Sequence, residues 1–85
     1  MSEKYHPTGR QIAAARTLAG ISQADLAASA QISVPTLRRM EASEGQASGM
    51  ANNVAAVMRA LEKAGIEFLN HGQPGVRLRK AKPEG

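Results

Sequence analysis

Two adjacent arginines, Arg38 and Arg39, carry the most distinctive chemistry in this chain of 85 residues. Their neighbours Leu37 and Met40 are apolar and three residues apart, which is the spacing of the inward face of a helix. The arginines therefore lie on or near the outward face, where a partner can reach them. A guanidinium group donates paired hydrogen bonds to planar acceptors, including phosphate oxygens and the O6 and N7 atoms of guanine. For Arg38 the alternative is a solvated surface side chain.

Other side chains that often carry chemistry are poorly placed for it. His6 and His71 lie in terminal and turn segments with no second ligand at metal-binding spacing, and the chain has no cysteine. Serine, histidine and aspartate are present, but a chain this short offers no cleft that would shield a catalytic triad from water. We therefore expect no catalytic residue, no metal site and no cofactor, and we expect that the protein is not an enzyme.

The composition is typical of a small helical domain with an affinity for polyanions. Lys and Arg number 11 against 7 Asp and Glu, which gives a formal net charge of +4; this charge suits nucleic acid without requiring it. Hydrophobic residues make up 42% of the chain, yet alanine supplies much of that share and the aromatic residues are only Tyr5 and Phe68. Small side chains favour closely packed helices, so we expect an all-α body. No stretch reaches the roughly 20 apolar residues of a membrane span, so we expect a cytoplasmic protein that contacts no membrane.

Helix-start signals divide the first half of the chain into three short helices. Residues suited to N-caps mark the starts, namely Thr8, Ser22 and Ser33. The predicted helices cover residues 9–19, 23–30 and 34–41. Gln11 completes a capping-box pattern with Thr8, and Gly20 can close the first helix in a left-handed conformation.

The second half of the chain changes its hydrophobic period. A fourth helix that ends at Gly65 is predicted from inward residues at helical spacing, which are Val54, Val57, Met58 and Leu61. Beyond it, apolar residues alternate with polar ones around a turn-rich segment and predict a β-hairpin; these residues are Ile66, Phe68, Val76 and Leu78. We expect a flexible leader at residues 1–7, a helical domain at 8–65, a β extension at 66–80 and a disordered tail at 81–85.

Two short helices joined by a tight turn, the second with an exposed polar and basic face, form a helix-turn-helix, whose second helix enters the major groove of DNA. The run GISQADLA from Gly20, followed by ISVPTLRRME from Ile32, resembles the Cro and phage-repressor-like family, also called Xre-type. The resemblance covers about residues 9–65. It implies a compact four-helix, lambda repressor-like DNA-binding domain, to which the hairpin or a single β-strand is added as a C-terminal extension.

The resemblance also implies which residues bind DNA. The matched positions are Gln23, Ser33, Val34, Pro35, Thr36, Arg38 and Arg39. In the family, the glutamine at Gln23 binds a phosphate and the residue at Ser33 caps the recognition helix. The positions that face base edges are Val34, Pro35, Thr36 and Arg39. Arg39 is expected to bind guanine, and Val34 and Pro35 can offer apolar contact to a thymine methyl group.

Arg16 and Glu41 match a pair of charges that, in the family, ties the first helix to the end of the recognition helix. We expect this ion pair to be structural, because a partly buried pair fixes orientation more than it adds net stability. One departure concerns the turn between the second and third helices. Gln31 stands where the family usually has glycine, at a position that often needs a positive φ.

A second departure concerns the loop at residues 43–49, which is frequently basic in relatives. In this chain the loop carries the acidic Glu44, so it should bind phosphate weakly. Asn52 and Asn53, at the start of the fourth helix, could compensate with neutral hydrogen bonds to DNA.

These features predict a sequence-specific transcriptional regulator, a repressor, that reads a pseudo-palindromic operator in double-stranded DNA through its third helix. An isolated hairpin is marginal in water, so we expect a second copy in a homodimer to cover the apolar face formed by Ile66, Phe68, Val76 and Leu78. Packing of that face on the fourth helix of the same chain is the alternative. A second functional hypothesis is an antitoxin or other protein-interaction module, which would bind a toxin through the hairpin and DNA for autoregulation.

Overall fold

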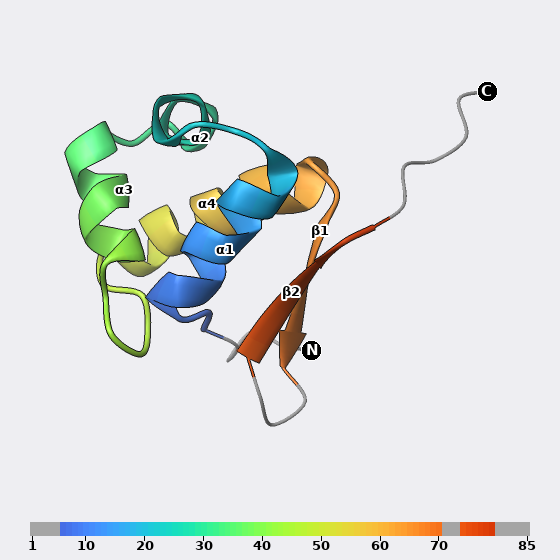
Figure 1. Ribbon diagram of the computed structural model, residues 1–85. Helices are drawn as coiled ribbons and strands as arrows, with labels where there is room; N and C mark the ends of the chain where they lie inside the picture. Colours follow the sequence, from blue (N-terminus) through green and yellow to red (C-terminus); the bar gives the residue numbers. More distant parts are fainter. Residues whose placement is uncertain (1–5, 71–73, 80–85) are drawn as a thin grey trace.

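The computed structural model describes residues 6–70 and 74–79. In this part of the chain, four helices come first, and they are α1 (Gly9–Ala19), α2 (Gln23–Ala30), α3 (Val34–Glu41) and α4 (Ala51–Lys63). An antiparallel hairpin follows, made of β1 (Ile66–Asn70) and β2 (Pro74–Leu78). The hairpin lies along α1, on the side away from α3 (Figure 1). The predicted four-helix body with a C-terminal hairpin is therefore confirmed, and no described helix is long and apolar enough to cross a membrane.

Side-chain caps explain where the first three helices begin. Thr8 Oγ1 accepts a hydrogen bond from the main-chain N–H of Gln11 (2.9 Å), and Gln11 Oε1 accepts one from the N–H of Thr8 (2.8 Å). Ser22 and Ser33 cap α2 and α3, each accepting from the N–H three residues later, at 3.0 and 3.1 Å. These bonds satisfy amides that have no partner within a helix. The predicted starts of these three helices are confirmed.

Left-handed residues end α1 and α2. Gly20 has φ 76°, and Gln31 has φ 61° although its side chain makes this conformation costly by about 1 kcal/mol. The turn after Gln31 offsets that cost, because the N–H of Ile32 reaches back to the carbonyl of Ala27 (2.9 Å) in the Schellman pattern. The chain therefore keeps the expected backbone turn with a residue other than glycine.

All four helices and β1 contribute to one apolar core. Its buried members are Ile12, Ala15, Leu26, Ala27, Ala30, Leu37, Met40, Val54, Val57, Leu61 and Ile66. Leu18 is an apolar residue of α1 that does not join this core, and it is 45% exposed. At 3.6 residues per turn it lies about 120° around the helix axis from Ile12, which defines the buried face.

The hairpin packs on its own chain. Its apolar face was expected to be covered by a second copy in a homodimer, and this expectation is wrong. Ile66 is buried in the core, and Phe68 and Val76 pack against it from the same face of the sheet. Most of the apolar face of the hairpin is covered by α1, and α4 contacts β1 to a smaller extent. The alternative expectation, packing on the fourth helix of the same chain, therefore identified a helix that makes the smaller contribution. Leu78, at the end of this face, stays 45% exposed.

Gln11 fixes the hairpin to α1. Its side chain is buried, and its Nε2 donates hydrogen bonds to the carbonyl oxygens of Leu69 (3.2 Å) and Gly75 (2.9 Å) on the two strands. The same amide group therefore closes the capping box of α1 and holds both strands, so the helix start and the hairpin are parts of one hydrogen-bonded unit.

The start of α1 is also joined to the loop that follows α3. The N–H of Gly9 donates to the carbonyl of Gly45 (2.9 Å), and the N–H of Ala47 donates to that of Pro7 (3.0 Å). Pro7 is buried. The expected flexible leader at residues 1–7 is therefore too long, because Pro7 belongs to the folded body. Residues 1–5 and the expected tail at residues 81–85 lie outside the described residues.

Candidate nucleic-acid interface

Helix α3 is anchored along one edge and open along the other. Leu37 and Met40 are fully buried and fix the helix to the core. The predicted DNA-binding positions that are exposed are Ser33, Pro35, Arg38 and Arg39, and the half-buried ones are Val34 and Thr36. Because the anchor residues share a turn with the arginines, packing determines the direction in which the open edge faces.

The two apolar positions on this edge differ in what they can reach. Val34 packs against the core and keeps only part of its side chain accessible, whereas Pro35 is exposed. Pro35 is the first-turn residue, where its missing N–H removes no helical hydrogen bond. An apolar contact to a thymine methyl group would therefore involve Pro35 more than Val34.

Thr36 is held by the cap of its own helix. Ser33 Oγ accepts from the N–H of Thr36 and donates its hydroxyl proton to Thr36 Oγ1 at 2.8 Å. A hydroxyl group has one donor and two acceptor positions, so Thr36 keeps its proton for an outside acceptor. The arrangement suits Thr36 as a donor to a base or phosphate oxygen at the N-terminal end of α3.

The C-terminal end of α3 is fixed by serines that the sequence analysis did not single out. Ser43 Oγ donates to the carbonyl of Arg39 (3.2 Å) and accepts from the N–H of Ser48 (2.9 Å). Ser48 Oγ also approaches the carbonyl of Arg39, at 3.5 Å. Serines directly after a helix often bond to its last carbonyls, and that pattern is the signal that could have found them. The loop thus steadies the turn that carries Arg39.

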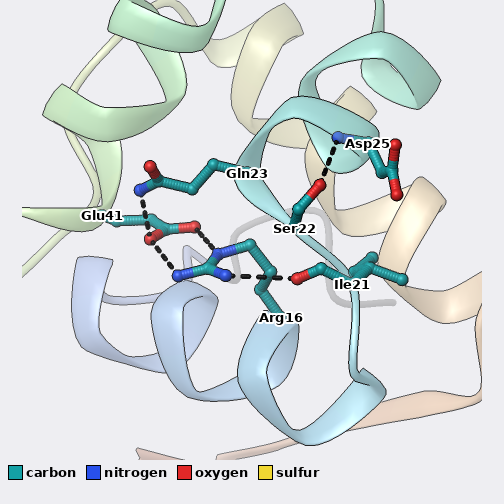
Figure 2. A network of polar contacts seen from close by, with 6 residues as sticks. All are labelled: Arg16, Ile21, Ser22, Gln23, Asp25 and Glu41. Carbon is teal, nitrogen blue, oxygen red and sulfur yellow. Dashed lines mark hydrogen bonds and ion pairs between the residues drawn. The ribbon is translucent and has the colours of Figure 1, made fainter.

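Three helices meet at Glu41 in a network of polar contacts (Figure 2). Arg16 Nε on α1 donates to Glu41 Oε2 at 2.7 Å, and Arg16 Nη2 donates to Oε1 at 3.2 Å. Arg16 Nη1 reaches the carbonyl of Ile21 (3.2 Å), and Gln23 Nε2 on α2 donates to Glu41 Oε1 (3.0 Å). The Glu41 side chain is only 7% exposed and that of Arg16 21%. The network therefore fixes both helices of the helix-turn-helix against α1.

The bond to Glu41 restricts the direction in which Gln23 can present its amide. An amide group has two N–H donors and one carbonyl acceptor, and only one donor is used by Glu41. Gln23 is the first residue of α2, where the main-chain amides favour an anion. The second N–H of Gln23 can therefore bind a phosphate without breaking the inward bond.

At the start of α4, Asn52 is exposed and Asn53 half-buried. Met50, the N-cap, makes no side-chain bond to the first turn and is 68% exposed. Both asparagines are thus on a first turn without a side-chain cap, directly after the loop at residues 43–49, in which Glu44 is exposed.

The described residues contain no group of three or more His, Cys, Asp and Glu that could hold a metal ion. His6 is exposed, and His71 lies outside the described part of the chain.

Comparison with known proteins identifies the helical segment. Residues 12–50 match the helix-turn-helix family HTH_3, and the match runs from Ile12 in α1 through α2, α3 and the anchored loop to Met50. A search of curated proteins gave no match. Residues 12–50 are therefore a helix-turn-helix domain of the Xre/Cro-like family, which implies that the protein binds DNA.

Proposed function

We propose that this protein is a sequence-specific transcriptional regulator, a repressor, that binds a pseudo-palindromic operator as a homodimer and inserts α3 into the major groove. The observation that carries the proposal is the open edge of α3, where Arg38 and Arg39 are exposed while the helix is anchored by Leu37 and Met40. Specific recognition needs side chains held in a fixed frame, because a mobile arginine binds any phosphate but selects no base.

The residues divide into base-reading and phosphate-binding groups. Arg39 is proposed to make paired hydrogen bonds to guanine, with Pro35 beside it for a thymine methyl group. Arg38, the amide of Gln23 and the first turn of α4 with Asn52 and Asn53 are proposed to bind phosphates. Repression follows from occupancy of an operator and needs no catalytic group. The antitoxin hypothesis rests on the hairpin alone and stays a prediction.

The proposal is tested by selecting bound sequences from a random pool of duplex DNA at about 0.15 M salt, where non-specific binding driven by charge alone is weak. We expect a consensus with two related half-sites. Recovery of no consensus, or equal binding of all sequences with the same salt dependence, would refute a sequence-specific role.

A further inference from the structure

Met50 is a large apolar side chain that the fold leaves in water. It is 68% exposed, more than any other large apolar residue in the described part of the chain. It is also the N-cap of α4, a position at which Ser, Thr, Asp or Asn would bind a free main-chain amide, and it makes no such bond. The other helices described use Thr8, Ser22 and Ser33 for this purpose. Methionine at this position therefore adds neither to the apolar core nor to the start of its helix.

The main chain on both sides of Met50 is held in place. Gly49 has a positive φ of 118°, and a Cβ atom there would lie 3.7 Å from Met40 Cε on α3. The N–H groups of Asn53 and Val54 both donate to the carbonyl of Met50, at 2.9 and 3.0 Å. Figure 1 shows the loop that runs from the end of α3 to the start of α4. Met50 is therefore fixed at the point where this loop, packed on α3, enters α4.

This position is continuous with the edge of the molecule that is proposed to bind DNA. Arg39 is exposed near the end of α3, and its carbonyl lies 3.5 Å from Ser48 Oγ, two residues before Met50. Asn52, two residues after Met50, is exposed on the first turn of α4. The match to the helix-turn-helix family also extends to Met50. Duplex DNA is therefore the partner that this exposed side chain is placed to meet.

The composition of the segment indicates which part of the DNA Met50 would contact. Residues 42–51 contain no Lys or Arg, and Glu44 is acidic, so the segment has no cation that would attract a phosphate. The apolar part of the DNA backbone is the carbon edge of the deoxyribose rings, which lie between the phosphates and the bases. A methionine side chain is unbranched and polarisable, so it adapts to an irregular apolar surface of this kind.

We propose that Met50 packs against deoxyribose rings of the duplex, beside the groove that α3 enters. The contact removes from water the apolar surface that the free protein exposes. It involves no charge and no base edge, so it contributes equally on every DNA sequence. The inference rests on the proposed insertion of α3 into the major groove, but it does not depend on a sequence-specific role.

Met50→Ala beside Met50→Leu tests the contact in binding assays on the selected operator. We expect Met50→Ala to bind about tenfold more weakly than wild type, which corresponds to partial burial of the methionine side chain. Met50→Leu keeps an apolar side chain of similar size and should bind within about twofold of wild type. The slope of log K against log salt concentration and the base preference should both be unchanged, because no charge and no base contact is removed.

Met50→Ser shows whether methionine is needed for the fold. Serine can cap α4, so we expect the melting temperature to rise by several degrees while the affinity for DNA falls as in Met50→Ala. A lower melting temperature in Met50→Ser would show that Met50 supports the fold, and this result would overturn the inference.

Three binding results would also overturn it. The first is equal affinity of wild type and Met50→Ala, or an equal loss in Met50→Leu. The second is a loss confined to one base position, which would assign Met50 to a thymine methyl group. The third is a loss with a smaller salt slope, which would indicate that phosphate-binding groups had moved.

The same comparison on a duplex of arbitrary sequence, at about 0.05 M salt, separates this inference from the proposed function. If the selection yields no consensus while Met50→Ala still binds the arbitrary duplex about tenfold more weakly, the sequence-specific role fails and the contact stands. If a consensus with two half-sites is recovered and Met50→Ala binds it as tightly as wild type, the contact fails and the proposed function stands.

Discussion

Glu41 is the residue at which the stability of the domain and the placement of its DNA-binding groups are joined. Its carboxylate is nearly buried and accepts hydrogen bonds from Arg16 and from Gln23. A buried carboxylate left without its cation is costly, because water cannot replace the lost partner. The network therefore supports the fold, and its loss should also change the position of the Gln23 side chain at the start of α2.

Arg16→Ala tests this support. We expect the free energy of unfolding to fall by about 1–3 kcal/mol, because Glu41 loses its cation while staying buried. The measurement is chemical denaturation followed by circular dichroism. Arg10→Ala is the matched control, since Arg10 is exposed on the same helix and its loss should change the stability by less than about 0.5 kcal/mol. Equal effects of the two substitutions would contradict the structural role of the ion pair.

Arg39→Ala and Gln23→Ala separate base reading from phosphate binding. We expect Arg39→Ala to relax the preference at one position of each half-site, at a cost of about 1–3 kcal/mol for the preferred base. Gln23→Ala should weaken binding by a similar factor for every sequence, because a phosphate contact carries no base information. Binding assays with a panel of single-base variants of the selected operator measure both. If both substitutions lower affinity for all sites alike, α3 is not the reading element.

Arg38→Ala checks the phosphate assignment independently. If Arg38 binds a phosphate, its removal should reduce the slope of log K against log salt concentration by about 1 while leaving the base preference unchanged. An unchanged slope would indicate that Arg38 is a solvated side chain.

At the scale of elements, the helix boundaries were predictable because their causes are local. The capping box of Thr8 and Gln11 and the caps Ser22 and Ser33 involve residues three apart, which a sequence displays directly. The start of α4 was less sharply predictable. Its N-cap, Met50, makes no side-chain bond to the helix, so no local chemistry marks that position.

Gln31→Gly tests the strain at the turn between α2 and α3. Gln31 holds a left-handed conformation with φ 61° that glycine adopts without penalty. We expect a gain in stability of about 0.5 kcal/mol, less than the strain of about 1 kcal/mol because glycine also gains freedom in the unfolded chain. Gly20→Ala, at the corresponding position of α1, should shift the melting temperature in the opposite direction. A loss of stability in Gln31→Gly would show that its side chain makes a contact that outweighs the strain.

Gly9→Ala tests how closely the start of α1 approaches the end of α3. Helix propensity alone favours alanine by about 1 kcal/mol. An added Cβ atom, however, would lie 2.6 Å from the carbonyl oxygens of both Met40 and Ser43, and main-chain atoms cannot move aside cheaply. We therefore expect destabilisation of about 1–3 kcal/mol in thermal denaturation, together with weaker operator binding. Gly75→Ala is the control, because the nearest heavy atom there is 3.9 Å away.

At the scale of the whole molecule, the sequence predicted the hairpin but not what covers it. The hairpin was predicted to have one apolar face, because apolar and polar residues alternate at Ile66, Phe68, Val76 and Leu78. This alternation is a local pattern, so it does not indicate which helix or which chain packs against that face. The structure supplies α1, through contacts between residues far apart in the chain. The hydrogen bonds of Gln11 to Leu69 and Gly75 span 58 and 64 positions, and locally Gln11 is recognisable only as half of a capping box. Hydrogen bonds between residues so far apart in the chain form only in the assembled fold, so the sequence does not display them.

The within-chain packing of the hairpin makes Phe68 a core residue rather than an interface residue, and this can be measured apart from dimerisation. Phe68→Ala should lower the free energy of unfolding by about 1–3 kcal/mol, because Phe68 is half-buried against the core of its own chain. Urea denaturation at two protein concentrations tenfold apart provides the measurement, and the loss in the free energy of unfolding should be the same at both.

Glu67→Ala is the control on the opposite face of β1. Its carboxylate is exposed and bonded to Arg77, which holds the pKa of Glu67 below its ordinary value, and an exposed pair of this kind contributes little. If Phe68→Ala lowers the free energy of unfolding only at the higher protein concentration, then Phe68 acts between copies and the packing of the hairpin on α1 does not stabilise the monomer.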